Sequence, residues 1–296
     1  MTKIAIVGAS GFIGRACRDN FPTDTICLVR DPKHFQDVRF EFGTSSLLDV
    51  AGIETCTHVL ILAANREPAE CEQLPEKTWW TNVAAPISLI REALRCGLVP
   101  VFASTEMVYG PGTKPSLETA EISPKSVYGR QKAQVETFLK SNANSSLVMR
   151  IAKTVGHTPQ DKSLFTNWIQ DFRNGSDVLR CADDQFMTPI YVHDLAKSIW
   201  QLCAFGCSGI FNMGGKQRFT REELLRVLID KSNLNGISTP NVEICSFREF
   251  PSSLWLDNDY SMDSERLWQS TGLLHTTMEE VVALCLDSAV RDGSHS

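Results

Sequence analysis

The amino-acid sequence predicts an α/β protein in which a doubly wound parallel sheet is followed by a smaller, less regular C-terminal portion. Three observations carry this prediction. Strand-like apolar runs alternate with helix-like segments of about 10 to 15 residues through the first half of the chain. A glycine-rich turn joins the first strand to the first helix, as in Rossmann-type sheets. The regular alternation then fades in the second half.

In the first half, strands are expected at residues 3–9, 25–30, 57–64, 98–104 and 145–152, and helices at 12–20, 82–96 and 126–140. The helix at 82–96 has apolar residues at helical spacing: Val83, Ile87, Ile90 and Leu94. The strands are nearly continuous apolar runs, which is typical of a parallel sheet covered by helices on both faces.

In the second half, helices are expected at 165–172 and 221–230, whereas residues 233–259 are expected to be irregular with several short β-prone pieces. A strand and a helix near residues 185–230 are expected to return to the first sheet. No internal repeat or low-complexity segment appears along the chain.

The composition excludes several classes of protein. The chain has 296 residues, of which 43% are hydrophobic and 22% charged, so it can bury a substantial core and is not disordered. Its net charge of −6 provides no basic surface for nucleic acid or anionic lipid. The apolar runs are far shorter than the roughly 20 residues of a membrane span, and no cleavable signal opens the sequence. We therefore expect a cytoplasmic protein with no nucleic-acid or membrane partner.

Ten cysteines are spread along the chain without a repeated spacing. In a chain of this size without a signal peptide, they are expected to be reduced and to pack as small buried side chains. Cys203 and Cys207 share one face of an expected helix, and His193 is not far away, but the further ligands of a metal site are missing. No metal is expected.

The segment GASGFIG places three glycines between the first strand and the first helix. Gly8 permits the tight turn, Gly11 lets a pyrophosphate approach the backbone, and Gly14 lets the helix lie against the sheet. Backbone N–H groups at the start of the helix then face the phosphates. The predicted cofactor contacts in this segment are Gly8, Ser10, Gly11, Phe12, Ile13 and Gly14. A glycine-rich turn without a ligand is the alternative, which the position after a hydrophobic strand disfavours.

Residues 1–155 are accordingly expected to form a dinucleotide-binding Rossmann domain, completed by returning segments near 185–230. Residues 156–296 are expected to be mainly a smaller substrate-binding portion. The end of the second strand indicates which dinucleotide binds, because a carboxylate there hydrogen-bonds the ribose of NAD and an arginine accommodates the 2′-phosphate of NADP. Arg30 at this position favours NADP, Asp31 directly after it leaves NAD open, and a solvated strand-end charge is the alternative for Arg30.

Tyr128 and Lys132 are four residues apart and share one face of the helix expected at 126–140. A nearby ammonium favours the phenolate, so Lys132 is expected to lower the pKa of Tyr128 from its usual value near 10, and it can also hold the nicotinamide ribose. Ser104 and Thr105 end a buried strand, and Thr105 can polarise a substrate carbonyl. The alternatives are helix capping for the hydroxyls and an ordinary amphipathic helix for the pair.

These motifs resemble those of the extended short-chain dehydrogenases/reductases that act on nucleotide sugars, over nearly the whole chain. The matching segments are GASGFIG, LILAA, WTNVAAP, STEMVYG, SVYGRQK and RIAKTVG. Residues 63–86 and the segment DDQFMTPIYVHDLAKSI look most like the dTDP-4-dehydrorhamnose reductase branch. The resemblance implies Thr105, Tyr128 and Lys132 as the catalytic residues and Asn82 as a residue that helps to order the site. It implies a cofactor site that adds Arg30, Ala63, Ala64, Asn82, Tyr128 and Lys132 to the glycine loop.

The chain departs from the family at three places. Thr44 follows Gly43 where the family often has an acidic residue that contacts adenine, and Ile190 replaces a usual threonine. Glu106 and Met107 replace the Asp-Tyr pair that follows the threonine in the reductase branch. Sugar-nucleotide dehydratases have an Asp-Glu pair there, and Met107 cannot act as the second base, which disfavours dehydration.

The resemblance implies an oxidoreductase that reduces a 4-keto-6-deoxy nucleotide sugar, with hydride from NADPH or NADH and a proton from Tyr128. A nucleotide-sugar 4-epimerase with the same three residues stays open. A non-catalytic regulatory subunit with the reductase fold also stays open. A nucleotide sugar is the expected partner, and assembly as a homodimer is left open.

Overall fold

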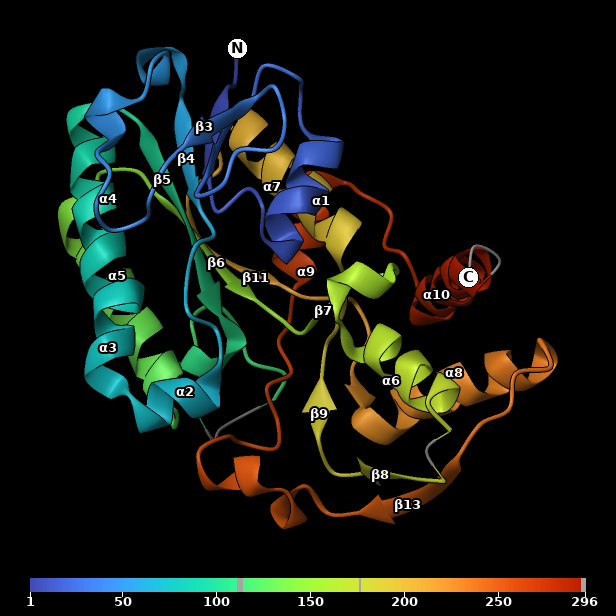
Figure 1. The fold of residues 1–296 in the computed structure, drawn as a ribbon. Helices are drawn as coiled ribbons and strands as arrows, with labels where there is room; N and C mark the ends of the chain where they lie inside the picture. Colours follow the sequence, from blue (N-terminus) through green and yellow to red (C-terminus); the bar gives the residue numbers. More distant parts are fainter. Residues whose placement is uncertain (111–113, 176, 294–296) are drawn as a thin grey trace.

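The computed structural model describes residues 1–110, 114–175 and 177–293 and confirms the α/β architecture (Figure 1). A seven-stranded parallel sheet has the order β3-β2-β1-β4-β5-β6-β11, which is the Rossmann order with its switch point between β1 and β4. Its strands are β1 (Ile4–Val7), β2 (Ile26–Val29), β3 (Asp37–Arg39), β4 (His58–Ile61), β5 (Val99–Thr105), β6 (Leu147–Ile151) and β11 (Gly209–Met213).

Helices cover both faces of the sheet. On one face α1 (Phe12–Asn20) packs against α7 (Val192–Ala204), and on the other α4 (Ala85–Arg95) packs against α5 (Val127–Asn142) (Figure 1). Alternate residues of β1 enter the two cores, because successive side chains of a strand point to opposite faces. Ile4 and Ile6 belong to the core that α1 and α7 complete, and Ala5 and Val7 to the core that α4 and α5 complete.

Short helices connect β4 to α4, and the remaining helices and strands build the C-terminal portion. The connection contains α2 (Pro68–Gln73), α3 (Pro75–Trp79) and a π-helical turn (Trp80–Ala84). The helices of the C-terminal portion are α6 (Leu164–Arg173), α8 (Arg221–Leu234) and α10 (Met278–Gly293), while α9 (Glu265–Thr271) packs on α7 and β11. Its strands pair as β7 (Thr154–Val155) with β10 (Ile190–Tyr191), β9 (Phe186–Met187) with β12 (Phe219–Thr220), and β8 (Val178–Ala182) with β13 (Asn241–Cys245).

Most predicted elements of the sheet are confirmed, including a strand and a helix from the second half that return to it as β11 and α7. Three details differ. The three-residue strand β3 was not predicted, because it has too few residues to show a pattern. The helix expected at 82–96 is preceded by the π-helical turn that contains Asn82. The segment 233–259, expected to be irregular with short β-prone pieces, contains a five-residue strand, β13, which is partly exposed and therefore lacks an apolar signature.

Within residues 1–110, 114–175 and 177–293, no helix combines the length and the apolar character that crossing a bilayer would require. All ten cysteines lie in this part of the chain, and all are free thiols, mostly buried.

Candidate active site

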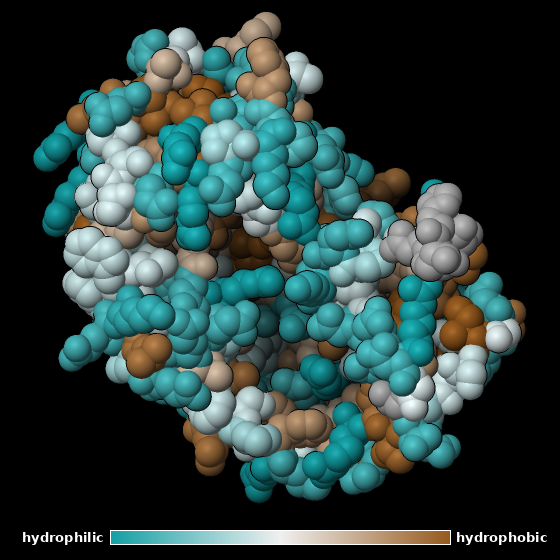
Figure 2. Space-filling view, viewed as in Figure 1, coloured by the Kyte–Doolittle hydropathy of each residue, from teal (hydrophilic) through white to brown (hydrophobic). Residues whose placement is uncertain are grey.

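A cleft of about 730 Å³ opens at the carboxyl ends of the central strands, where ligands bind in parallel α/β sheets. Figure 2 shows the molecule hollowed between the sheet and the C-terminal portion, with mostly hydrophilic side chains around the opening. Every predicted site residue except Asn82 lines this cleft: Gly8, Ser10, Gly11, Phe12, Ile13, Gly14, Arg30, Ala63, Ala64, Thr105, Tyr128 and Lys132. Residues far apart in the sequence therefore meet at one site.

Each of the three loop positions requires glycine for a different physical reason. Gly8 has a φ of +92°, and a Cβ added there would lie 2.9 Å from the backbone N of Ala63. At Gly14 a Cβ would lie 2.3 Å from the carbonyl oxygen of Gly8, so helix α1 could not approach the strand. Gly11 is different, because its added Cβ would meet only that same carbonyl, at 3.3 Å. The fold requires Gly8 and Gly14, whereas the open face at Gly11 fits the close approach of a ligand.

The N-terminus of α1 also fits an anionic ligand. Its capping residue is Gly11, which has no side chain to accept hydrogen bonds from the first N–H groups of the helix. Those N–H groups face the cleft together with the positive end of the helix dipole. The described residues of the loop thus fit the pyrophosphate of a dinucleotide.

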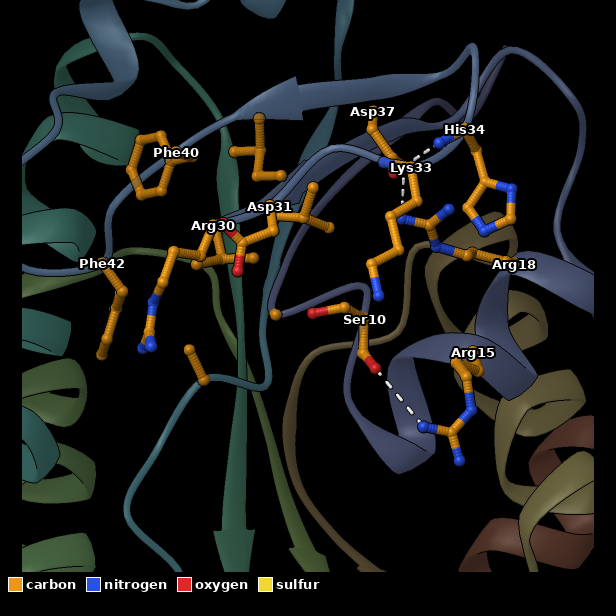
Figure 3. A pocket seen from close by; sticks show the side chains of 15 residues that line it. Ser10, Arg15, Arg18, Arg30, Asp31, Lys33, His34, Asp37, Phe40 and Phe42 are labelled. Carbon is orange, nitrogen blue, oxygen red and sulfur yellow. Dashed lines mark hydrogen bonds and ion pairs between the residues drawn. The ribbon is translucent and has the colours of Figure 1, made fainter. Parts of the chain in front are cut away.

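Beside the loop, a cavity of about 570 Å³ lies where the adenosine end of a dinucleotide would extend (Figure 3). Arg30, at the end of β2, lines it, but its exposed guanidinium is 3.5 Å from the Glu41 carboxylate and extends toward Phe42. Asp31 and Lys33 lie on the same wall, nearer to Ser10. The cavity therefore combines cations, a carboxylate and an aromatic ring.

Tyr128 and Lys132 lie on α5, whose first turn is fixed by two side chains. Ser126 accepts a hydrogen bond from the N–H of Gly129 at 3.0 Å, and Glu72 accepts one from the N–H of Val127 at 2.6 Å. Lys132 is buried and donates from Nζ to the carbonyl oxygen of Ala103, 2.8 Å away. Its Nζ lies 5.7 Å from the centre of the Tyr128 ring. The predicted pair therefore shares one wall of the cleft, held by the start of the helix.

The electrostatics of this pair differ from the expectation that Lys132 lowers the pKa of Tyr128. In this structure burial raises the pKa of the Tyr128 phenol above its usual value, with a further contribution from Cys71. Burial also lowers the pKa of Lys132 to about 8, although Glu136 opposes this shift. Tyr128 is therefore a protonated phenol at neutral pH, and Lys132 loses its charge as the pH rises through about 8.

Thr105 and Ser104 end β5 beside the pair, and their hydroxyls have different roles. The Thr105 hydroxyl accepts a hydrogen bond from the N–H of Met107 at 3.2 Å, which caps the following 3-10 turn Glu106–Val108. Its own proton stays available for donation to a ligand. The Ser104 hydroxyl instead donates to the buried carboxylate of Glu136. Of the two hydroxyls, Thr105 is the one that suits a substrate carbonyl.

Asn82 is fully buried and does not line the cleft. Its side-chain oxygen accepts from the N–H of Asn65 at 2.8 Å, and its amide donates to the carbonyl oxygen of Asn65 and to Gln131 at 2.9 and 2.8 Å. Asn82 thus joins the loop after β4 to helix α5. This position fits the ordering role that the family resemblance implies, whereas the expected contact with the cofactor is not supported by the lining of the cleft. The π-helical turn around Asn82 is a feature often found at functional sites.

Two further site residues, Lys153 and Arg221, were not predicted from the sequence. They line a neighbouring cleft of about 260 Å³ that also includes Glu106, together with aromatic side chains from Phe186, Phe247, Phe250 and Tyr260. Lys153 lies deep in the cleft yet is reached by solvent, and burial lowers the pKa of both Lys153 and Arg221. Neither cation has a carboxylate within ion-pair distance among the residues described. The segment RIAKTVG contained Lys153, but no spacing signal marked Arg221.

Glu106 connects the two clefts. It is buried at the end of β5, lines both cavities, and accepts a hydrogen bond from the N–H of Lys153 at 3.1 Å. Burial raises its pKa to about 7, against an opposing effect of Lys153. Across the described chain, no group of three His, Cys, Asp or Glu side chains is arranged to hold a metal ion.

The glycine loop, Thr105, Tyr128 and Lys132 line one cleft at the carboxyl ends of a Rossmann-type sheet, the arrangement implied by the resemblance to extended short-chain dehydrogenases/reductases. The sequence matches the family described as RmlD substrate binding domain over residues 2–291, so the chain belongs to that family. The resemblance to the dTDP-4-dehydrorhamnose reductase branch is thereby confirmed.

Three known proteins are similar to this chain. Methionine adenosyltransferase 2 subunit beta of Xenopus tropicalis is 27% identical over 246 residues, which are 78% of this chain and 72% of that protein. The structure of MoeE5 in complex with UDP-glucuronic acid and NAD has a TM-score of 0.82 at 19% identity, covering 99% of this chain and 100% of the other. The dTDP-4-dehydrorhamnose reductase of Bacillus anthracis str. Ames in complex with NADP has a TM-score of 0.80 at 16% identity, covering 97% and 99%.

Proposed function

We propose that this protein reduces a 4-keto-6-deoxy nucleotide sugar with NADPH as the hydride donor. One observation carries the proposal: Thr105, Tyr128 and Lys132 line the same cleft as the open glycine loop. A tyrosine, a lysine and a hydroxyl at the mouth of a dinucleotide site are the groups needed to protonate a carbonyl oxygen as hydride reaches its carbon.

The residues of the chain have separate tasks in this reaction. A bound nicotinamide supplies the hydride. Tyr128, protonated because burial raises its pKa, donates its phenolic proton to the oxygen of the substrate carbonyl. Thr105 donates a hydrogen bond to the same oxygen and orients it. Lys132, anchored on the carbonyl of Ala103, holds the ribose next to the nicotinamide and stabilises the phenolate left after proton transfer.

The neighbouring cleft supports a nucleotide as the other half of the substrate. Lys153 and Arg221 offer two cationic groups without carboxylate partners in the described structure, which suits a diphosphate. The aromatic rings of the same cleft suit stacking with a nucleobase. MoeE5, which shares the fold, is solved in complex with both UDP-glucuronic acid and NAD. We accordingly assign cofactor binding to residues 1–155 with the returning segments near 185–230, and substrate binding mainly to residues 156–296.

A regulatory subunit is the second candidate, since a relative over most of the chain is named as a subunit beta of methionine adenosyltransferase 2. Arrangement of all three reactive side chains around one cleft favours the enzyme. An epimerase shares these residues and differs in keeping its cofactor between the two hydride transfers.

The experiment is incubation of the purified protein with NADPH and a panel of 4-keto nucleotide sugars while the absorbance of NADPH is followed. The proposal expects stoichiometric loss of absorbance with at least one 4-keto-6-deoxy sugar. A parallel incubation supplies NAD and nucleotide sugars that carry a C4 hydroxyl. Interconversion of their C4 epimers without net formation of NADH would identify an epimerase. Tight binding of NADPH with no change in any sugar of the panel would favour the regulatory subunit.

A further inference from the structure

We propose that Lys33, rather than Arg30, selects NADPH over NADH, and that Asp31 opposes this selection. The inference deepens the proposed function, since it concerns the adenosine end of the same dinucleotide site. It rests on which charged side chains around this cavity already have partners and which do not.

Four side chains with permanent positive charge line the cavity, and three of them are engaged in ion pairs. The three pairs are Arg15 with Asp161 at 3.1 Å, Arg18 with Asp37 at 2.5 Å, and Arg30 with Glu41 at 3.5 Å. Within the described residues, the ammonium of Lys33 is the remaining cation of the cavity, and no carboxylate or carbonyl there accepts a hydrogen bond from it. Lys33 is thus a cation of this cavity that can bind a phosphate without first leaving a carboxylate partner.

The backbone holds Lys33 in place for such a ligand. The carboxylate of Asp37 accepts hydrogen bonds from the N–H groups of Lys33 and His34 at 2.7 and 2.9 Å, while Arg18 secures Asp37 from the side of α1. Figure 3 shows the Lys33 ammonium and the Ser10 side chain extending into the same space. A flexible lysine on a fixed loop beside a hydroxyl is suited to a phosphate group.

Arg30 occupies a different part of the cavity. Its guanidinium extends away from Ser10 and toward Phe42 (Figure 3). A planar cation next to an aromatic ring suits the flat face of an adenine. Adenine is common to NADPH and NADH, so a contact of this kind contributes to the binding of both and distinguishes neither.

Asp31 opposes Lys33. Its carboxylate is directed into the cavity between Arg30 and Lys33 (Figure 3), and no described side chain or N–H donates a hydrogen bond to it. A carboxylate in this place accepts hydrogen bonds from the ribose hydroxyls of NADH and repels the 2′-phosphate of NADPH. Substitutions at Lys33 and Asp31 should therefore change the cofactor preference in opposite directions.

The test measures binding of 2′,5′-ADP and 5′-AMP by calorimetry. These ligands differ in the 2′-phosphate and lack both nicotinamide and sugar substrate, so the result does not depend on turnover. Lys33→Met should weaken 2′,5′-ADP by about tenfold to a hundredfold and leave 5′-AMP nearly unchanged. Asp31→Asn should strengthen 2′,5′-ADP and weaken 5′-AMP. Arg30→Met should weaken both ligands by a similar factor.

Lys140→Met, an exposed lysine at the end of α5, is the matched control and should change neither affinity. Lys33 is exposed, so loss of folding is not expected in its variant, and thermal melting checks this. Equal weakening of both ligands by Lys33→Met, selective loss of 2′,5′-ADP in Arg30→Met, or failure of the wild type to bind either ligand would overturn the inference. Intact selectivity with no reduction of any keto sugar would leave this inference standing and remove the proposed function.

Discussion

Helix α5 carries two groups of buried charges one turn apart, and they are built differently. Lys132 faces the cleft with Tyr128, and Glu136 faces the sheet. The Glu136 carboxylate is 2.7 Å from the Arg150 guanidinium, and both side chains are almost wholly buried. Arg150 donates to the Tyr109 hydroxyl at 2.8 Å. The hydrogen bonds of Glu136 are internal to the fold, whereas the cleft leaves polar atoms open to a ligand.

The network around Glu136 continues until its polar groups are satisfied. The Tyr109 hydroxyl donates to Asn212 at 2.8 Å, and the Asn212 amide donates to the backbone carbonyls of Ser116 and Asp263 at 2.9 and 2.8 Å. It thereby joins β6 and β11 of the sheet to loops at the base of the C-terminal portion. A buried polar network of this kind stabilises one arrangement only if all its members are paired.

In the cleft, burial without full pairing shifts pKa values instead. Lys132 has a pKa lowered to about 8, Glu106 has one raised to about 7, and the pKa of Tyr128 is raised as well. The shifts at Lys132 and Glu106 reduce stability near neutral pH, because the folded state disfavours the charged form of each group there. The fully hydrogen-bonded Glu136 thus stabilises the fold, whereas Lys132 and Glu106 in the cleft keep polar atoms available for a ligand.

The largest effect is expected at Tyr128. Tyr128→Phe removes the proton donor but little packing, so turnover should fall by about 10² to 10⁴-fold while the variant folds and binds NADPH normally. Lys132→Met should lose turnover and also some affinity for NADPH, because the lysine serves both steps. Steady-state kinetics and fluorescence titration with NADPH separate the two outcomes. A Tyr128→Phe variant within about threefold of wild type would remove tyrosine from the mechanism.

Arg150→Met should lower stability and leave the binding of NADPH nearly unchanged, whereas the substitutions at Tyr128 and Lys132 lower turnover. Breaking the buried pair leaves the Glu136 charge without its partner, so the free energy of unfolding should fall by about 3 to 5 kcal/mol, measured by urea denaturation. Affinity for NADPH in the folded protein should change little. The double variant Glu136→Met with Arg150→Met is the control, and it should recover part of the stability. A stable Arg150→Met protein that fails to bind NADPH would contradict the assignment of the Glu136 network to stability and of the cleft to ligand binding.

Gly11→Val tests the open face of the loop. A Cβ here would lie 3.3 Å from the Gly8 carbonyl oxygen, which needs only a small backbone adjustment, whereas it would occupy the space of the pyrophosphate. Affinity for NADPH should therefore fall by about tenfold to a hundredfold, with only a small change in melting temperature. If the effect is steric, the affinity of Gly11→Ala for NADPH should lie between that of Gly11→Val and that of the wild type. Calorimetry showing wild-type affinity in Gly11→Val would refute the cofactor assignment.

Glu106→Gln should give the smallest effect, with a defined dependence on pH. The folded pKa of Glu106 is raised from 4.5 to about 7, so the folded wild type binds more protons than the unfolded chain in this range and loses stability as the pH rises through it. The glutamine variant lacks this loss. Relative to wild type its stability should rise by roughly 3 kcal/mol between about pH 4.5 and about pH 8. The weaker hydrogen bond from the N–H of Lys153 lowers the stability of the variant by a constant amount at every pH, so the net difference at neutral pH is small. If the free energies of unfolding of the two proteins change in parallel with pH, the raised pKa of Glu106 is contradicted.

Much of the sheet and the cofactor loop could be predicted from sequence, because local patterns encode them. The glycines report backbone geometry, and the spacing of Tyr128 and Lys132 reports one helix face. The parts that could not be predicted depend on contacts between distant segments. Lys153 and Arg221 are 68 positions apart and meet only in the folded cleft.

Two expectations changed for a similar reason. Asn82 turned inward because Asn65 and Gln131 supply its partners, and no pattern in the sequence shows that. The pKa of Tyr128 is raised rather than lowered because of burial, which depends on the whole fold. The direction of Arg30, away from Ser10, likewise follows from its pairing with Glu41.

The most direct test of the account follows the hydride itself. The protein is incubated with NADPH deuterated at C4 of the nicotinamide and with dTDP-4-dehydrorhamnose, and the sugar product is analysed by mass spectrometry and NMR. The account predicts one deuterium at C4 of the sugar for each NADP released, and loss of this transfer in Tyr128→Phe. Recovery of unlabelled sugar and intact NADPH from a protein that binds both ligands would contradict it.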